Sequence, residues 1–322
     1  RRYNMKEGKK KNKESVWQVF WKQRYLQMFV LLGVVYVLIF NYAPMVGLII
    51  GFKDYKITGG LKGMFTSQWV GLKYFKEFFT EYKFPELMRN TLVLSILKLI
   101  FSFPIPILFA VLLNEVRNKA AKKFIQTVSY LPYFISWVIV AGMLRILASD
   151  TGVINNVLMA LHLTKQPLEI LTSPKYFTAM AVLTAIWKDT GWWAIVFLAA
   201  ITGIDPSLYE AAEMDGATRT QRIRYITLPC IAGTITVVLI MALGNLLGGG
   251  LSGSNFEQCY LLGNQGNMEV SDIIQTYVMR TGLSNGRYSY ATAVGMFQSV
   301  ISVTLVFISN FISKRVSGNG LF

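Results

Sequence analysis

The stretch YEAAEMDGATRTQRIRYITLP, residues 209–229, is polar and contains glycine, yet it lies between two strongly apolar segments. The preceding segment, residues 176–204, has Lys188 and Asp189 as its only charged residues, and the following segment, residues 225–256, has none. Each is long enough to cross a bilayer core as a helix, which takes about 20 residues. The pattern therefore predicts a polar loop between two membrane-spanning helices.

Composition extends this interpretation to the whole chain. Of the 322 residues, 53% are hydrophobic, which is typical of a polytopic membrane protein. We predict an all-α integral membrane fold with six transmembrane helices in a domain of residues 25–313. The expected spans are about 26–51, 90–113, 124–147, 177–201, 228–250 and 289–313.

The distribution of Lys and Arg predicts which ends face the cytoplasm. These residues are concentrated in the N-terminal segment 1–24, in the loops 115–123 and 205–227, and in the tail 314–322, which predicts that both termini lie inside. Residues 53–89 also carry seven Lys and Arg, but four acids accompany them. The net charge of +15 is then explained by topology and by contact with anionic membrane lipid, without a nucleic-acid partner.

The polar loop contains the signals of two short helices joined by a turn. Asp205 followed by Pro206 predicts a capped helix start, with a helix over residues 206–214. Gly216 can adopt the left-handed conformation that ends a helix, and a second helix is expected from about Thr218. Such an elbow is typical of a docking element.

The spacing of residues in this loop also forms a recognisable motif. Glu210, Ala211 and Ala212 are followed by Gly216, and then by Ile226, Leu228 and Pro229. This spacing resembles the EAA loop of transmembrane permease subunits in binding-protein-dependent ABC importers. The stretches WVGLKYF, YLPYFISW, FEQCYLLGN and SYATAVGMFQSVISVTLVFISNFISKR are similar to the branch that imports oligosaccharides and polysaccharide fragments.

The resemblance implies a type I ABC importer permease that catalyses no reaction itself. The helix carrying Glu210 would seat in a cleft of a separate ATPase, and the coupling residues implied are Glu210, Ala211, Ala212, Asp215, Gly216, Ile226, Leu228 and Pro229. The sequence has no G-x-x-x-x-G-K-[ST] loop, so ATP-Mg is expected on the ATPase and no cofactor is expected in this chain.

The same resemblance implies a set of partners in a bacterial cytoplasmic (inner) membrane. They are a second homologous permease subunit, two ATPase subunits, an extracytoplasmic solute-binding protein and an oligo- or polysaccharide substrate. The solute-binding protein is expected to dock on the outer segments 53–89 and 257–287.

Ionisable and aromatic side chains in the fourth span are candidates for the translocation path. The stretch WKDTGWW contains Lys188, Asp189, Trp192 and Trp193, and charges at membrane depth require a functional or structural explanation. The structural alternative is that the two charges satisfy one another or backbone carbonyls between packed helices. Adjacent helical residues diverge by about 100°, so both charges cannot point into one cavity equally well.

A glycine-rich break at the end of the fifth span provides further candidates. In GNLLGGGLSGSNFEQ, the polar residues Asn245, Asn255, Glu257 and Gln258 surround backbone that membranes tolerate only beside protein or a cavity. We expect Asn245, Asn255 and Glu257 to face the path.

Several other residues give weaker expectations. Lys98 is interpreted as a snorkelling residue near the outer end of its span. Leu72, Phe75 and Phe79 share one face of a predicted interfacial helix. His162 has no neighbours suited to a metal site, and no metal is expected.

Two other functions are compatible with a polytopic chain. A proton- or sodium-coupled secondary transporter would use Lys188 and Asp189 as its relay, although no duplicated half is visible. A membrane-embedded enzyme is disfavoured by the lack of a recognisable nucleophile or metal-ligand arrangement.

Overall fold

The computed structural model describes residues 21–318 and residue 320. Within this part of the chain all regular structure is helical apart from one isolated antiparallel bridge between Lys53 and Trp69, so the all-α prediction is confirmed. In the following lists, η marks a short 3₁₀ or π turn. The elements up to Thr202 are α2 (Arg24–Val37), η1 (Leu38–Tyr42), α3 (Ala43–Met45), η2 (Val46–Phe52), η3 (Ile57–Gly59), α4 (Gly60–Thr66), α5 (Lys73–Thr80), α6 (Phe84–Ser102), α7 (Pro104–Asn114), α8 (Lys119–Tyr130), η4 (Leu131–Phe134), α9 (Trp137–Leu147), α10 (Val153–Ala160) and α11 (Pro174–Thr202). The remaining elements are α12 (Pro206–Met214), α13 (Arg219–Arg222), η5 (Ile223–Thr227), α14 (Leu228–Cys230), α15 (Ala232–Gly244), η6 (Leu246–Gly248), α16 (Asn255–Leu262), α17 (Met268–Ser271), α18 (Ile274–Met279), η7 (Arg280–Ser284) and α19 (Tyr288–Ser317).

The chain divides into two compact units, residues 1–50 and residues 51–322. The described part of the first unit is almost entirely one helical run, in which α2 continues into the π turn η1 and then α3. Pro44 lies in the first turn of α3 and has no backbone N–H to offer the preceding turn. The widened turn at η1 accommodates this missing hydrogen bond.

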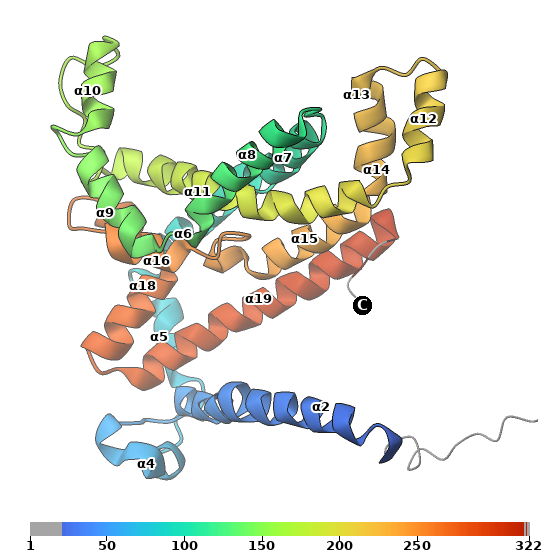
Figure 1. The fold of residues 1–322 in the computed structure, drawn as a ribbon. Helices are drawn as coiled ribbons and strands as arrows, with labels where there is room; N and C mark the ends of the chain where they lie inside the picture. Colours follow the sequence, from blue (N-terminus) through green and yellow to red (C-terminus); the bar gives the residue numbers. More distant parts are fainter. Residues whose placement is uncertain (1–20, 319, 321–322) are drawn as a thin grey trace, which may run out of the picture. The chain divides into compact units, whose positions relative to one another are not determined.

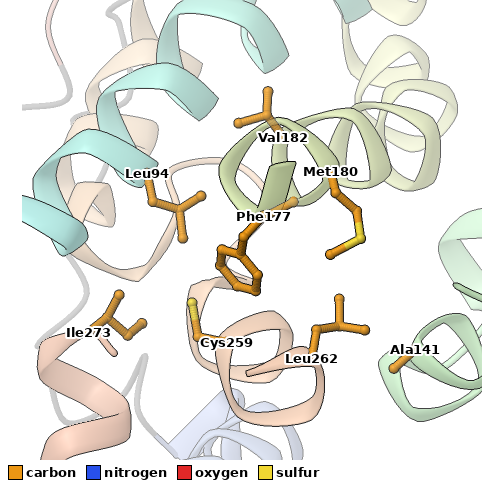
Figure 2. Packing of buried hydrophobic residues seen from close by; sticks show 9 residues of the cluster. Leu94, Ala141, Phe177, Met180, Val182, Cys259, Leu262 and Ile273 are labelled. Atoms are coloured by element: carbon orange, nitrogen blue, oxygen red, sulfur yellow. The ribbon is translucent and has the colours of Figure 1, made fainter. Parts of the chain in front are cut away.

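The second unit packs around α11. In Figure 2, Phe177 of α11 lies between Leu94 of α6 and Cys259 of α16, and all three side chains are almost fully buried. Towards its other end, α11 places Phe197 in a second cluster that includes Ala110 of α7. Because lipid tails are as apolar as these side chains, close packing holds such helices together more than the hydrophobic effect does.

Gly191 marks the tightest helix approach in this core. A Cβ atom at this position would lie 2.0 Å from the backbone oxygen of Ser129, near the end of α8. Only glycine fits so close to another backbone, and small residues are used in this way where membrane helices meet. The contact fixes α11 against α8 at the middle of the predicted fourth span.

Three described helical runs are long and apolar enough to cross a membrane without a sharp bend. They are Arg24–Phe52, Phe84–Asn114 and Tyr288–Arg315. Three pairs qualify only across a bend, namely Lys119–Phe134 with Trp137–Leu147 at 98°, Pro174–Thr202 with Pro206–Met214 at 70°, and Arg219–Cys230 with Ala232–Gly244 at 61°. The described residues therefore contain three spans, or up to six if each bent pair counts as one span. The six spans predicted from the sequence equal this upper limit.

Helix α5 packs through a face that the sequence pattern did not identify. Tyr74 and Phe78 are buried against α19, whereas Leu72 and Phe79 of the predicted apolar face are about half exposed. Tyr74 Oη donates a hydrogen bond to Asp54 Oδ1 over 2.7 Å. Burial, followed by this hydrogen bond, raises the pKa of Tyr74 to about 12, so the phenol stays neutral. The segment before α6 is thus tied to the bundle while one apolar face remains uncovered within the chain.

Candidate functional site

The loop of residues 205–227 has the geometry that its sequence predicts. Asp205 Oδ1 accepts a hydrogen bond from the backbone N–H of Ser207 over 2.9 Å, and this interaction lowers the pKa of the Asp205 carboxyl. Helix α12 follows, and Gly216 has φ +77°, the left-handed conformation that favours glycine. Thr218 and Gln221 then form a reciprocal capping box at the start of α13.

Two side-chain contacts join the arms of this elbow. Arg222 Nη1 lies 3.1 Å from Glu213 Oε2, and the hydroxyl groups of Tyr209 and Thr227 are 2.9 Å apart. Thr227 is buried, so the second contact anchors α12 to the base of the loop. The elbow is therefore a defined shape that its own residues maintain.

The outer surface of α12 is exposed, as a docking element requires. Glu210, Ala211, Asp215, Gly216 and Pro229 are exposed, whereas Ala212, Ile226 and Leu228 are half-buried. Leu228 packs against the cluster around Phe197, so it serves as an anchor of the loop. Sequence reasoning missed Leu208 and Met214, whose side chains are 46% and 88% exposed on the same short helix. Exposed apolar residues beside a carboxylate are the signal that could have identified them.

Lys188 is held inside the bundle in the way the structural alternative describes. Its Nζ donates to the backbone oxygen of Tyr133 over 2.6 Å and lies 5.1 Å from the Tyr133 ring centroid and 5.5 Å from that of Trp137. Such cation–π contacts stabilise a desolvated ammonium group. In this structure Lys188 is therefore partnered by protein groups.

The two tryptophans of the fourth span are also engaged by protein groups. Trp192 stacks on Tyr133 with ring centroids 4.5 Å apart and an interplanar angle of 6°. Trp193 Nε1 donates to the backbone oxygen of Leu251 over 3.2 Å. Both rings help to hold neighbouring segments, and their contact with a substrate stays a prediction.

Lys98 does not snorkel, and the prediction that it does is wrong. The side chain is 1% exposed, and its Nζ donates to Ser254 Oγ over 3.1 Å. Ser254 is hydrogen-bonded in turn to Ser252. The residues Lys98, Ser254 and Ser252 thus form a polar network between α6 and the glycine-rich break. Its members are far apart in sequence, so local sequence patterns could not identify it.

The amides of the glycine-rich break stabilise its irregular backbone. Asn245 Nδ2 donates to the backbone oxygen of Gly250 over 3.0 Å, and Asn255 Nδ2 donates to Ser95 Oγ over 2.8 Å. Gln258 Nε2 donates to the backbone oxygen of Ala181 over 2.8 Å. Gly249 has φ +111°, and a Cβ there would lie 2.8 Å from Asn255 Oδ1. Side-chain hydrogen bonds therefore give the break a defined backbone conformation, as expected for non-helical backbone at membrane depth.

Four buried acceptor atoms in this region lack a hydrogen-bond donor among the described residues. They are Asp189 Oδ2, Asn255 Oδ1, Glu257 Oε2 and Gln258 Oε1. Buried acceptors usually have partners, so unsatisfied ones indicate a place for water or for a ligand hydroxyl. The break therefore offers acceptors, while each of its amide nitrogens already donates at least one hydrogen bond.

Within the described part of the chain, no group of three His, Cys, Asp or Glu side chains is arranged to hold a metal ion. His162 is exposed and lies in the turn after α10 with φ +54°.

The second unit is thus a helical bundle with buried polar groups, a glycine-rich break and an exposed elbow, and a family of known proteins matches it. Residues 102–318 match the family described as binding-protein-dependent transport system inner membrane component. The chain belongs to this family. Its members are membrane components of importers and not enzymes, and the membership favours an ATP-driven importer over the ion-coupled alternative.

Relatives and solved structures refine the assignment of this permease. It is 45% identical to the protein LplB of Bacillus subtilis (strain 168), over 94% of this chain and 92% of LplB. It is 44% identical to the polygalacturonan/rhamnogalacturonan transport system permease YteP of the same organism, over 94% of this chain and 91% of YteP.

A crystal structure of a bacterial ABC transporter that imports the acidic polysaccharide alginate contains a similar chain. The TM-score is 0.84 at 40% identity, with 94% of this chain and 100% of the other chain covered. A second structure of an alginate transporter, in complex with a periplasmic protein bound to an alginate pentasaccharide, gives a TM-score of 0.84 at 39% identity, covering 96% of this chain and 100% of that one. The permease therefore has the type I ABC permease fold and is the inner membrane component of a binding-protein-dependent transport system.

Proposed function

We propose that this permease forms half of the path for an acidic oligosaccharide and is driven by a separate ATPase that grips residues 205–227. The observation that carries the proposal is the preformed, exposed elbow of α12 and α13, which its own caps and cross-contacts hold in shape. A rigid element transmits a movement of the ATPase to the membrane helices, whereas a flexible loop would change its own shape instead. Glu210 and Ala211, with the apolar Leu208 and Met214 beside them, form the surface that the ATPase would contact.

The proposed orientation places the elbow and both termini in the cytoplasm. A second permease subunit completes the path, two ATPase subunits bind ATP-Mg, and an extracytoplasmic solute-binding protein docks on segments 53–89 and 257–287. The basic residues around the elbow and in loop 115–123 support this orientation.

The acidic character of the substrate is supported by two relatives. One is a permease for polygalacturonan and rhamnogalacturonan, and the other belongs to an importer of the acidic polysaccharide alginate. In the interior, the unsatisfied acceptors near the glycine-rich break would receive hydrogen bonds from sugar hydroxyls. The buried ammonium groups of Lys98 and Lys188 add positive charge to that region.

The coupling role is tested by charge reversal on the elbow. Glu210→Lys should leave the permease inserted but lower binding-protein-stimulated ATP hydrolysis and uptake by about thirtyfold or more, the scale of a central interface contact. Gly216→Pro should do the same, because proline cannot adopt a positive φ. Both are measured in proteoliposomes containing the assembled transporter.

The matched control is Glu115→Lys. Glu115 is also exposed and lies in the other loop assigned to the cytoplasm, outside the elbow. This variant should retain uptake. Normal uptake in both elbow variants would contradict the coupling assignment.

A further inference from the structure

A cavity of about 360 Å³ opens among α16, α17, α18 and the turn η7. Figure 1 shows α18 and the elbow of α12 and α13 towards opposite ends of α19, so this cavity lies at the end of the bundle away from the proposed ATPase. Its volume falls within the range of roughly 300 to 1,000 Å³ that small-molecule sites occupy. The proposed coupling mechanism does not use it.

One cation with a fixed position lines the cavity. Arg280 Nη2 lies 2.6 Å from Asp272 Oδ2, and Asp272 Oδ1 accepts a hydrogen bond from Thr276 Oγ1 over 2.9 Å. The Asp272 side chain is 2% exposed, whereas that of Arg280 is 38% exposed. The buried Asp272 carboxylate therefore fixes the position of the more exposed Arg280 guanidinium. A guanidinium has five N–H donors, so others remain for a ligand.

Charge and shape in the rest of the lining favour an anionic sugar. Arg280 and Asp272 are the charged members of the lining, and Asp272 is turned away from solvent. Tyr260 is 56% exposed and is braced by Phe256, with stacked ring centroids 5.4 Å apart. An exposed, braced phenol ring offers a face for the apolar side of a pyranose, and the exposed Gln265 offers an amide for its hydroxyls.

We propose that this cavity binds a uronate residue of the saccharide, with the carboxylate on Arg280 and the sugar ring against Tyr260. Arginine matches a carboxylate with two parallel N–H donors, which a neutral sugar cannot use in the same way. The site rests on the proposed import of an acidic saccharide and gives that import an entry position before the glycine-rich break. The ligand of Arg280 is a carboxylate of the substrate.

The uptake experiment uses the complete transporter in proteoliposomes, with trigalacturonate loaded on the binding protein. Arg280→Gln should raise the KM for the loaded binding protein about tenfold, the scale of one charge-assisted contact, while maximal ATP hydrolysis is unchanged. Arg280→Lys should recover part of the loss, since it retains the charge without the two-pronged geometry. The control Lys175→Gln removes an exposed cation at the start of α11 that lies outside segments 53–89 and 257–287 and does not line the cavity, and its KM should stay that of the parent.

A labelling experiment tests the site without ATP or binding protein. In the assembled transporter, Gln265→Cys is labelled with a water-soluble maleimide, against the parent chain as background. Trigalacturonate should slow the labelling, and its neutral, carboxyl-reduced counterpart should not. Adding Arg280→Gln should abolish the protection.

Two results would overturn the site. One is an unchanged KM in Arg280→Gln together with no protection of the introduced thiol in Gln265→Cys. The other is a raised KM accompanied by a loss of binding-protein-stimulated ATP hydrolysis, which would make Arg280 a docking contact for that protein. Failure of the parent transporter to import any saccharide with ATP would instead contradict the proposed function, and the labelling result would still stand.

Discussion

The elbow of residues 205–227 and the glycine-rich break of residues 245–258 both interrupt apolar helices, but different contacts hold them. The elbow is fixed by neighbours in sequence, as in the cap of Asp205 on Ser207. The break is fixed by partners far away in the chain, since the Lys98–Ser254 hydrogen bond joins residues 156 positions apart. The elbow can therefore keep its shape while exposed to a partner, whereas the break exists only inside the assembled bundle.

The largest effect should come from reversing the buried charge that holds the break. Lys98→Glu would place a second buried anion near Asp189 and remove the donor to Ser254, and breaking such a buried charged network costs about 3–5 kcal/mol. We expect the purified permease to lose most of its thermal stability in detergent, measured by heating followed by size-exclusion chromatography.

Lys175→Glu is the control, because this lysine is exposed at the start of α11. It should melt near the parent temperature. Equal melting temperatures of Lys98→Glu and the parent would mean that the hydrogen bond from Lys98 to Ser254 does not stabilise the break.

A smaller effect is expected from the turn of the elbow. Gly216→Ala meets no atom within 4 Å of its new Cβ, so its cost comes from φ +77° alone and is about 1–2 kcal/mol. Hydrogen exchange of residues 206–222 should quicken while that of the break stays unchanged.

Gly142→Ala provides the comparison for that glycine. It also has open space around the new Cβ, but it lies inside helix α9 without a positive φ, where alanine is favourable. Equal exchange in the two variants would contradict the conformational explanation.

The smallest effect should be the pH dependence of the helix cap. The pKa of Asp205 is lowered in the folded chain, so its contribution is complete above the ordinary pKa of an aspartate and is lost as the pH falls through the lowered value. Amides of residues 206–214 should exchange faster at pH 3 than at pH 6, relative to Asp205→Asn at the same pH.

Asparagine caps a helix as well as aspartate does and does not titrate in this range. The ratio of exchange rates between parent and variant should therefore change with pH. A constant ratio would show that the carboxylate is not the relevant group.

This comparison also explains which features the sequence could predict. The cap at Asp205, the helix over 206–214, the turn at Gly216 and the helix start near Thr218 follow from rules that span a few residues, and the structure shows all of them. The helical class followed from apolar run lengths. The bends between paired helices were not predicted, because a run of apolar residues carries no information about direction.

The interior was harder to predict because its contacts are not local. Lys98 looked like an end-of-helix residue, since its hydroxyl partner Ser254 is recognisable only once α6 and the break lie together. Lys188 and Trp192 had two interpretations, and the carbonyl and ring of Tyr133 that engage them lie more than 50 positions earlier. The second face of α5, which packs on α19, was not predicted because that helix comes last in the chain.

The Lys98–Ser254 bond also has a consequence for how the chain is made. Lys98 leaves the ribosome long before Ser254, and at roughly 5–20 residues per second the delay is on the order of ten seconds. During that time a lysine near the middle of an inserted helix costs roughly 3 kcal/mol, which its leucine- and isoleucine-rich neighbours must offset. The second span therefore has to enter the membrane before Ser254 is available to accept a hydrogen bond from its lysine, and the order of insertion is a constraint on the sequence around Lys98.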